Sequence, residues 1–123
     1  MNHANLIKQT LKNGNKLPGT RLWSNPVGFG YNGKVIKNWS KNGKRYMVLE
    51  NPRPVTYGLC PGSLDIIGFH VVENRPVFAA IDAKTPGDNP SPIQKRFIGM
   101  ISKFNGFAGV LRKEGDLYEI FKI

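Results

Sequence analysis

The sequence predicts an α/β domain built from an apolar β-hairpin and a helix that follows it. Residues 66–72 and 77–81 are rich in β-branched and aromatic side chains, and a short polar turn separates them, which is typical of two strands in a buried sheet. The helix is predicted from its start, where Ser91 is an N-cap, Pro92 takes the first helical position and Gln94 completes a capping box. A chain of 123 residues is long enough for one hydrophobic core and too short for two.

The other elements follow from the spacing of apolar residues and from turn signals. Ala4, Ile7 and Leu11 share one face of an N-terminal helix that Asn2 caps. The helix after Ser91 is expected to bury an apolar stripe made of Ile93, Phe97, Met100, Ile101 and Phe104. In chain order we expect a helix over 3–12, a strand over 21–25, one or two hairpins over 28–58 that end at Pro52 to Pro54, the hairpin over 66–81, the helix from Ser91, a strand over 107–111 and a last strand over 117–123.

Positive charge is concentrated in the first part of the chain. Residues 1–49 contain nine Lys and Arg and no Asp or Glu, whereas residues 50–123 contain nine Lys and Arg and eight acids. The net charge of +10 exceeds what solubility requires of so small a chain. We therefore expect a nucleic acid as partner, because phosphate neutralisation supplies affinity. We expect no membrane partner, since there is no apolar run of 18 residues and no strongly amphipathic basic helix.

Residues 28–58 interleave aromatic rings with cations, a pattern that suits a nucleic-acid surface. Asn32-Gly33 and Asn42-Gly43 are hairpin turn signals, so this segment is predicted to form a basic β-hairpin arm. The simpler alternative is that half of the aromatic rings pack into the core and the lysines are only solvated. The predicted DNA contacts, which add one residue before the arm and one after it, are Arg21, Lys34, Lys37, Lys41, Lys44, Arg45 and Lys95.

The apolar hairpin also gathers charged residues at its open end. A two-residue loop at Asn74-Arg75 would place Asp65 opposite Lys84, so that Asp65, Asp82 and Lys84 project from one side of the sheet. Two adjacent carboxylates repel unless a cation lies between them, and Mg²⁺ prefers oxygen ligands. A lysine beside them can hold an attacking water or a phosphate oxygen, as in metal-assisted phosphodiester hydrolysis. On spacing alone, a cross-strand Asp–Lys salt bridge at a sheet end is the simpler interpretation.

The cysteine content and the N-terminal residues bear on disulfides, on cysteine metal sites and on the cellular location. One cysteine, Cys60, excludes an internal disulfide and a multi-cysteine metal site. The N-terminus lacks a charged stretch followed by a long apolar one, so we expect no signal peptide and a cytoplasmic location.

Several segments together resemble the VRR-NUC domain, a branch of the PD-(D/E)XK nucleases that occurs as small stand-alone proteins in phages and bacteria. These segments are PGSLDIIGF, IDAK, SPIQKRF and NGFAGVLR, preceded by RLWSNPVG and YGLCPG, and they run from Arg21 to Arg112. The resemblance implies a restriction-endonuclease-like core, in which a mixed central β-sheet is flanked by helices. It implies one domain over 1–123, with the 28–58 arm inserted before the catalytic hairpin. The cytoplasm would be that of a bacterium or of a phage-infected host cell.

The resemblance also implies a metal-dependent endonuclease that uses Mg²⁺ or Mn²⁺. Asp65 would be the first metal ligand and Asp82 the second, in the place where the family usually has Glu. The backbone carbonyl of Ala83 would add a ligand, Lys84 would orient the attacking water, and Gln94 would support the metal shell. The capping box explains Gln94 equally well.

One residue departs from the family pattern. Members often carry a Glu in the N-terminal helix that reaches the site, and His3 stands near that place here. His3 is therefore a further candidate ligand. Stand-alone members resemble Holliday-junction resolvases, so the resemblance implies a homodimer that acts on branched DNA. The alternatives are a non-catalytic nucleic-acid-binding module that keeps the fold, and a ribosomal-type RNA binder without a metal site.

Overall fold

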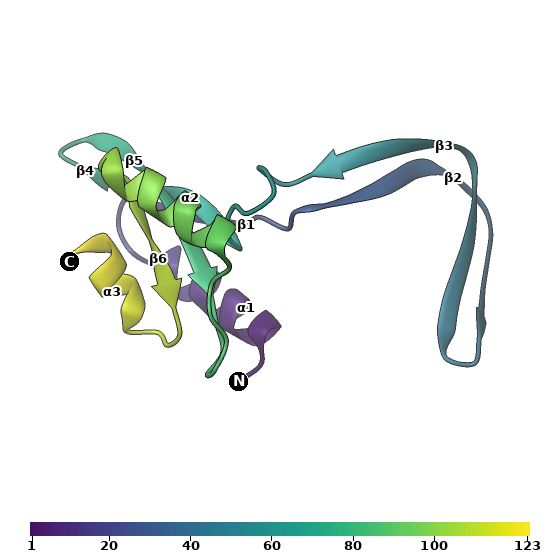
Figure 1. Cartoon of the computed structure of the whole chain (residues 1–123), viewed down its shortest axis with the longest axis horizontal. Helices are drawn as coiled ribbons and strands as arrows, with labels where there is room; N and C mark the ends of the chain where they lie inside the picture. Colours follow the sequence, from purple (N-terminus) through teal and green to yellow (C-terminus); the bar gives the residue numbers. More distant parts are fainter.

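The computed structural model describes residues 1–123 and shows a compact α/β body from which a long β-hairpin arm projects (Figure 1). This confirms the predicted fold class, a mixed central sheet flanked by helices. The elements are α1 (His3–Gly14), β1 (Thr20–Ser24), β2 (Gly28–Lys41), β3 (Lys44–Tyr57), β4 (Ile66–Val72), β5 (Arg75–Ala83), α2 (Pro92–Lys103), β6 (Phe107–Leu111) and α3 (Asp116–Phe121). None of the helices is both long and apolar enough to cross a membrane.

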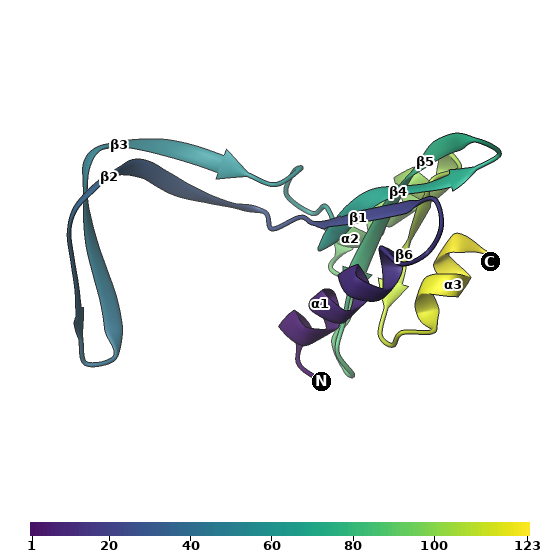
Figure 2. The same cartoon turned by 180° about the vertical axis from the view of Figure 1, so that it is seen from behind.

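The body is a four-stranded sheet in the order β1-β4-β5-β6. The strands β1, β4 and β5 pair antiparallel, and β6 runs parallel to β5 after the crossover through α2. The helices α1 and α3 lie on one face of the sheet and α2 lies on the other, as the two opposite views show (Figures 1 and 2). The two faces therefore have different surroundings.

The hydrophobic core lies between the sheet and the pair α1 and α3. Its buried members come from both helices and all four strands: Leu6, Leu22, Ile66, Ala79, Ile81, Ala83, Leu111, Leu117 and Phe121. His70 is buried in the same layer, where its ring stacks on Phe121 with 4.7 Å between ring centroids and its Nδ1 lies 2.7 Å from the Thr20 hydroxyl. Even-numbered residues of β4 and odd-numbered residues of β5 thus face this core.

The register of the β4–β5 hairpin differs from the predicted one by two. The loop is Glu73-Asn74 and not Asn74-Arg75, because Val72 pairs with Arg75. Both loop residues have positive φ, 50° and 64°, as a type I′ turn requires, and its twist suits the strands. Continuing the register beyond Ile66–Ile81 places Asp65 opposite Asp82 and not opposite Lys84. A shift of two preserves which face each side chain occupies, so the predicted face remains.

The C-terminal segment forms the helix α3 and not the predicted strand. Leu117 and Phe121, four residues apart, are both buried, with Ile120 packed beside them. This is helical spacing, whereas a strand would alternate. The Asp116 carboxylate accepts hydrogen bonds from the backbone N–H of Arg112 and of Lys113, and these bonds turn the chain into the helix.

The expected buried stripe on α2 was wrong for three of its five residues, since Ile93 is 50% exposed, Met100 49% and Phe104 74%. The other two, Phe97 and Ile101, are half-buried, and no residue of α2 is fully buried. The helix packs mainly on β6 and β5, and Ile93 also lies against Gly62. The predicted helix start is confirmed, since Ser91 and Gln94 form both bonds of the capping box.

The arm is a single hairpin, β2 with β3, whose turn is Asn42-Gly43. It runs beyond the predicted end at Pro52 to Pro54, as far as Tyr57, and Asn32-Gly33 lies within a strand instead of forming a turn. Two irregularities interrupt its register, between Asn32 and Lys34 and between Val35 and Lys37. Bulges bend paired strands, and Figures 1 and 2 show the arm turning part-way along its length. No arm residue is buried.

Candidate active site

Two aspartates and a lysine meet where β4 begins and β5 ends, on the α2 face of the sheet. Asp65 directly precedes β4, Asp82 is the next-to-last residue of β5, and Lys84 directly follows β5. The strand pairing that brings β4 and β5 together therefore also brings these three residues together, as the sequence predicted.

Asp65 is held in place through its backbone and its side chain. Its carbonyl oxygen accepts a 2.7 Å hydrogen bond from the Asn25 N–H, and its Oδ2 accepts one of 2.9 Å from the Ala83 N–H. His3 Nε2 lies 3.1 Å from the same Oδ2. An ionised carboxylate only accepts hydrogen bonds, so His3 must donate through Nε2–H. In this arrangement His3 orients Asp65, and its place as a candidate metal ligand stays a prediction.

Asp82 is fully buried, and neither of its carboxylate oxygens has a hydrogen-bond partner. Burial, and then the adjacent Asp65 carboxyl, raise the pKa of Asp82 to about 6, although Lys84 opposes that rise. Buried carboxylates are ordinarily hydrogen-bonded, because an unpaired one is costly. Asp82 is therefore an exception among buried carboxylates, since its two oxygens accept no hydrogen bond and the charged group beside it is Lys84.

Lys84 supplies the positive charge of the group. Its Nζ lies 3.4 Å from Asp82 Oδ2 and 4.0 Å from Asp88 Oδ2, and its side chain is only 12% exposed. Its backbone N–H bonds to the Leu111 carbonyl, which ties the residue to β6. The structure thus has an Asp–Lys salt bridge at this sheet end, but between Asp82 and Lys84 at the end of one strand and not across two strands as the simpler interpretation expected. This salt bridge does not account for the two Asp82 oxygens that have no hydrogen bond.

Gln94 and Asp65 line one cavity of about 380 Å³, together with Asn25, Val27 and Ile93. The cavity lies beside the neck of the arm, where Gly28 pairs with Tyr57. The Gln94 Oε1 is already bonded to the Ser91 N–H in the capping box. Its side-chain nitrogen is the group left for another partner. The structure thus brings Gln94 to the site and shows its capping role.

Asn25 is a positioning residue that sequence reasoning missed. Its buried side chain donates to Ser63 Oγ at 2.9 Å and to the Leu64 carbonyl at 2.8 Å, and it accepts from the Leu59 N–H at 2.9 Å. These bonds fix the segment that leads into Asp65. The available signal was a polar residue just after a strand and just before a proline.

In a comparison with protein-family models, the VRR-NUC domain matches residues 35–114 of this chain. The match covers Asp65, Asp82, Lys84 and Gln94. The chain belongs to the VRR-NUC domain family. No curated protein sequence matches it. The VRR-NUC domain indicates a nuclease-type function with DNA as substrate and an endonuclease kind of reaction.

The residues of this VRR-NUC site fit a divalent cation. The Asp82 oxygens, which accept no hydrogen bond, and the neighbouring Asp65 carboxylate form an all-oxygen donor set of the kind that Mg²⁺ and Mn²⁺ prefer. No group of three or more His, Cys, Asp or Glu side chains is placed to hold a metal ion. Two carboxylates are a usual protein share for Mg²⁺, for which water and substrate phosphate complete the shell.

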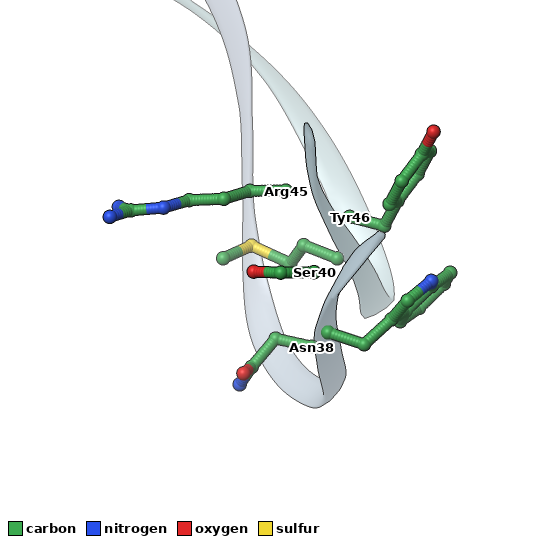
Figure 3. Close-up of a pocket in the computed structure, with 6 residues that line it drawn as sticks. Asn38, Ser40, Arg45 and Tyr46 are labelled. Atoms are coloured by element: carbon green, nitrogen blue, oxygen red, sulfur yellow. The ribbon is translucent and has the colours of Figure 1, made fainter. Parts of the chain in front are cut away.

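The predicted DNA contacts of this VRR-NUC chain are all exposed, and they fall into two groups. Arg21 lies on β1 and Lys95 on α2, both in the body. The other five, Lys34, Lys37, Lys41, Lys44 and Arg45, lie on the arm. The arm carries six Lys and Arg against one acid, Glu50. A hollow of about 630 Å³ adjoins the far part of the arm (Figure 3), away from the carboxylates, and side chains from both sides of the thin ribbon line it.

Proposed function

We propose that this VRR-NUC protein is a metal-dependent endodeoxyribonuclease of the PD-(D/E)XK type that hydrolyses DNA phosphodiester bonds. The observation that carries the proposal is the fully buried Asp82 carboxylate, which accepts no hydrogen bond at either oxygen and lies beside both the Asp65 carboxyl and Lys84. One lysine offsets only one of two neighbouring carboxylates, and a structural ion pair would ordinarily be completed by further hydrogen bonds. A divalent cation would offset the second charge.

Each residue of the site has a separate role. Asp65 and Asp82 hold Mg²⁺ or Mn²⁺, with the Ala83 carbonyl as a third oxygen donor. The ion supplies Lewis-acid chemistry, which activates water and offsets charge on the phosphate. Lys84 Nζ holds the attacking water or a phosphate oxygen, and the side-chain nitrogen of Gln94 orients one of these groups. His3 keeps Asp65 in its rotamer.

Branched DNA and a homodimer complete the proposal. Ile93, Met100 and Phe104 expose an apolar strip along α2, and exposed apolar strips mark interaction surfaces. Two copies joined there by a two-fold axis would carry two sites for paired cuts. We expect Phe104→Ser to lower the mass of the protein in light scattering from that of a dimer to that of a monomer. Ile123→Ser, at a residue that is 60% exposed on the C-terminus, is the matched control. A monomeric wild-type protein would contradict the dimer.

The test of the chemistry is cleavage of a labelled four-way junction, linear duplex and single strand with Mg²⁺, Mn²⁺ or EDTA. We expect metal-dependent cutting by the wild type and by Asp88→Asn, and loss of cutting in Lys84→Ala and Asp82→Asn. Paired cuts near the branch point would support the resolvase-like specificity. Metal-dependent cutting of every substrate would retain the chemistry and reject that specificity.

Two other functions have separate signatures in the same assay. Tight, salt-sensitive DNA binding without cutting in any metal would favour a binding module that keeps the nuclease fold. A preference for RNA without metal dependence would favour an RNA binder. The buried Asp82, which accepts no hydrogen bond and lies beside a second carboxyl, argues against both, since neither function requires a buried carboxylate of this kind.

A further inference from the structure

The far part of the arm has two chemically different faces. We define the distal limb as residues 37–41 of β2 and 44–48 of β3, which lie beyond both register irregularities. Trp39 pairs directly with Tyr46, and side chains alternate along each strand. One face, which we call the aromatic face, therefore carries Lys37, Trp39, Lys41, Lys44, Tyr46 and Val48. The other face carries Asn38, Ser40, Arg45 and Met47. Figure 3 shows Asn38, Ser40 and Arg45 pointing to one side of the ribbon and Tyr46 to the other.

The aromatic face is a flat, charged and open surface. The Trp39 and Tyr46 rings stack with 5.3 Å between centroids and 12° between their planes. Lys37 Nζ lies 5.1 Å from the Trp39 ring centroid. Trp39 is 40% exposed and Tyr46 41%, and every residue of the distal limb is exposed. The body therefore does not cover these rings.

A cross-strand aromatic pair also stabilises a hairpin, and Trp39 and Tyr46 do so. That role does not explain the charges around them. Three of the four cations of the distal limb, Lys37, Lys41 and Lys44, lie on the same face as the rings, and the limb has no acid. Clustered like charges on one face oppose folding unless a polyanion neutralises them. Rings and cations on one face match a ligand that offers both bases and phosphates.

We propose that the aromatic face of the distal limb is a stacking site for unpaired bases of single-stranded DNA, separate from the carboxylate site. The proposal rests on the proposed function for its substrate class and names which part of that substrate the arm recognises. An aromatic side chain can stack on a base only where a neighbouring base pair does not cover that base. The three lysines would contact the phosphates on either side. Duplex DNA presents the same phosphates, but neighbouring base pairs cover the faces of its bases.

The arm sets the distance between the two sites. Lys37 lies nine residue steps along β2 from the neck at Gly28. At about 3.3 Å per residue, the distal limb begins at most about 30 Å from the neck, roughly nine steps of a DNA strand. The unpaired stretch would therefore lie within about one helical turn of the cut. Single-stranded DNA next to a branch or a gap meets this condition.

The test uses the tryptophan of the distal limb as its own reporter. The protein has two tryptophans, so Trp23→Phe leaves Trp39 as the sole one. In EDTA, this protein is titrated with oligothymidylate, with an abasic oligomer of equal length and with duplex DNA. We expect oligothymidylate to quench Trp39 fluorescence and to bind about tenfold more tightly than the abasic strand, which has the same phosphates. Equal affinity for the two strands, or quenching by duplex alone, would overturn the proposal.

Two variants separate stacking from folding and from charge. Tyr46→Ala is expected to lose most of the preference for oligothymidylate over the abasic strand. Met47→Ala removes an equally apolar side chain from the opposite face and is expected to keep that preference. If both variants lose it equally, the aromatic face is not the site. The comparison of oligothymidylate with the abasic strand uses an unchanged distal limb. It is made in EDTA, so its outcome does not depend on whether the carboxylates support cleavage.

Discussion

The Asp82 carboxylate is the residue at which stability and the proposed chemistry oppose each other. It is fully buried and accepts no hydrogen bond, so its charged form destabilises the folded state even with Lys84 beside it. The pKa of Asp82 is raised from 3.8 to about 6, which means that the folded state binds its proton more tightly than the unfolded state does. The metal-free protein therefore loses stability as the pH rises from about 4 to about 6.

Replacing Asp82 should separate the two effects. We expect Asp82→Asn to abolish metal binding and, at pH 7.5 without metal, to raise the free energy of unfolding by on the order of 1 kcal/mol or more, because the buried charge is gone. Thermal unfolding measures the change in stability, and titration with Mn²⁺ measures the loss of metal binding. Asp88→Asn, at the more exposed partner of Lys84, is the control and should change neither. A destabilised Asp82→Asn would show that the ion pair between Asp82 and Lys84 stabilises the folded state by more than the buried charge costs.

The same pKa predicts how metal binding depends on pH. Asp82 must be ionised to bind a cation, so the affinity for Mn²⁺ should be constant above about pH 6 and fall about tenfold per unit below it. Calorimetric titration between pH 5 and 8 measures this profile. An affinity that stays unchanged down to pH 5 would mean that Asp82 is not a ligand.

At the scale of single elements, the close approach of β4 to β1 depends on Gly68. A Cβ at this position would collide with the Arg21 carbonyl oxygen and the Leu22 Cα of β1. We expect Gly68→Ala to destabilise the protein by roughly 1–3 kcal/mol. Gly99 lies within α2 with nothing within 4 Å of an added Cβ, so Gly99→Ala should stabilise by roughly 0.5–1 kcal/mol. Chemical denaturation of the two variants compares them directly, and the same sign for both would contradict this packing.

Sequence reasoning succeeded where a local pattern decided the outcome. The α2 cap depends on Ser91 and Gln94 alone, and the face shared by Asp65, Asp82 and Lys84 depends only on strand alternation. It failed where the outcome depended on packing. The loop lies at Glu73-Asn74 and not at the predicted position, because no glycine marks the turn in the sequence. Ile93, Met100 and Phe104 of the predicted α2 stripe are exposed, and Phe97 and Ile101 are only half-buried. His3 was placed near Asp65 correctly, but its hydrogen bond could not be derived from sequence.

At the scale of the whole molecule, the body and the arm divide stability and charge between them. All buried residues belong to the body, whereas the arm holds six of the eighteen Lys and Arg. We expect substitution of Gln for Lys34, Lys37, Lys41, Lys44 and Arg45 to leave the Tm of the body nearly unchanged. The slope of log affinity for duplex DNA against log salt should weaken by up to about 4, since each lost phosphate contact removes nearly one unit. An unchanged slope would show that DNA binds to the body alone.

The neck of the arm has a consequence for how this chain can vary. Gly28 pairs with Tyr57, so the two ends of the arm leave the body side by side. For the sheet of the body, the whole insertion is therefore equivalent to a short loop between β1 and β4. The entropic cost of closing a loop also rises only slowly with its length. Relatives of this protein could lengthen, shorten or exchange the arm while inheriting the same catalytic body, and the substrate could change faster in evolution than the chemistry.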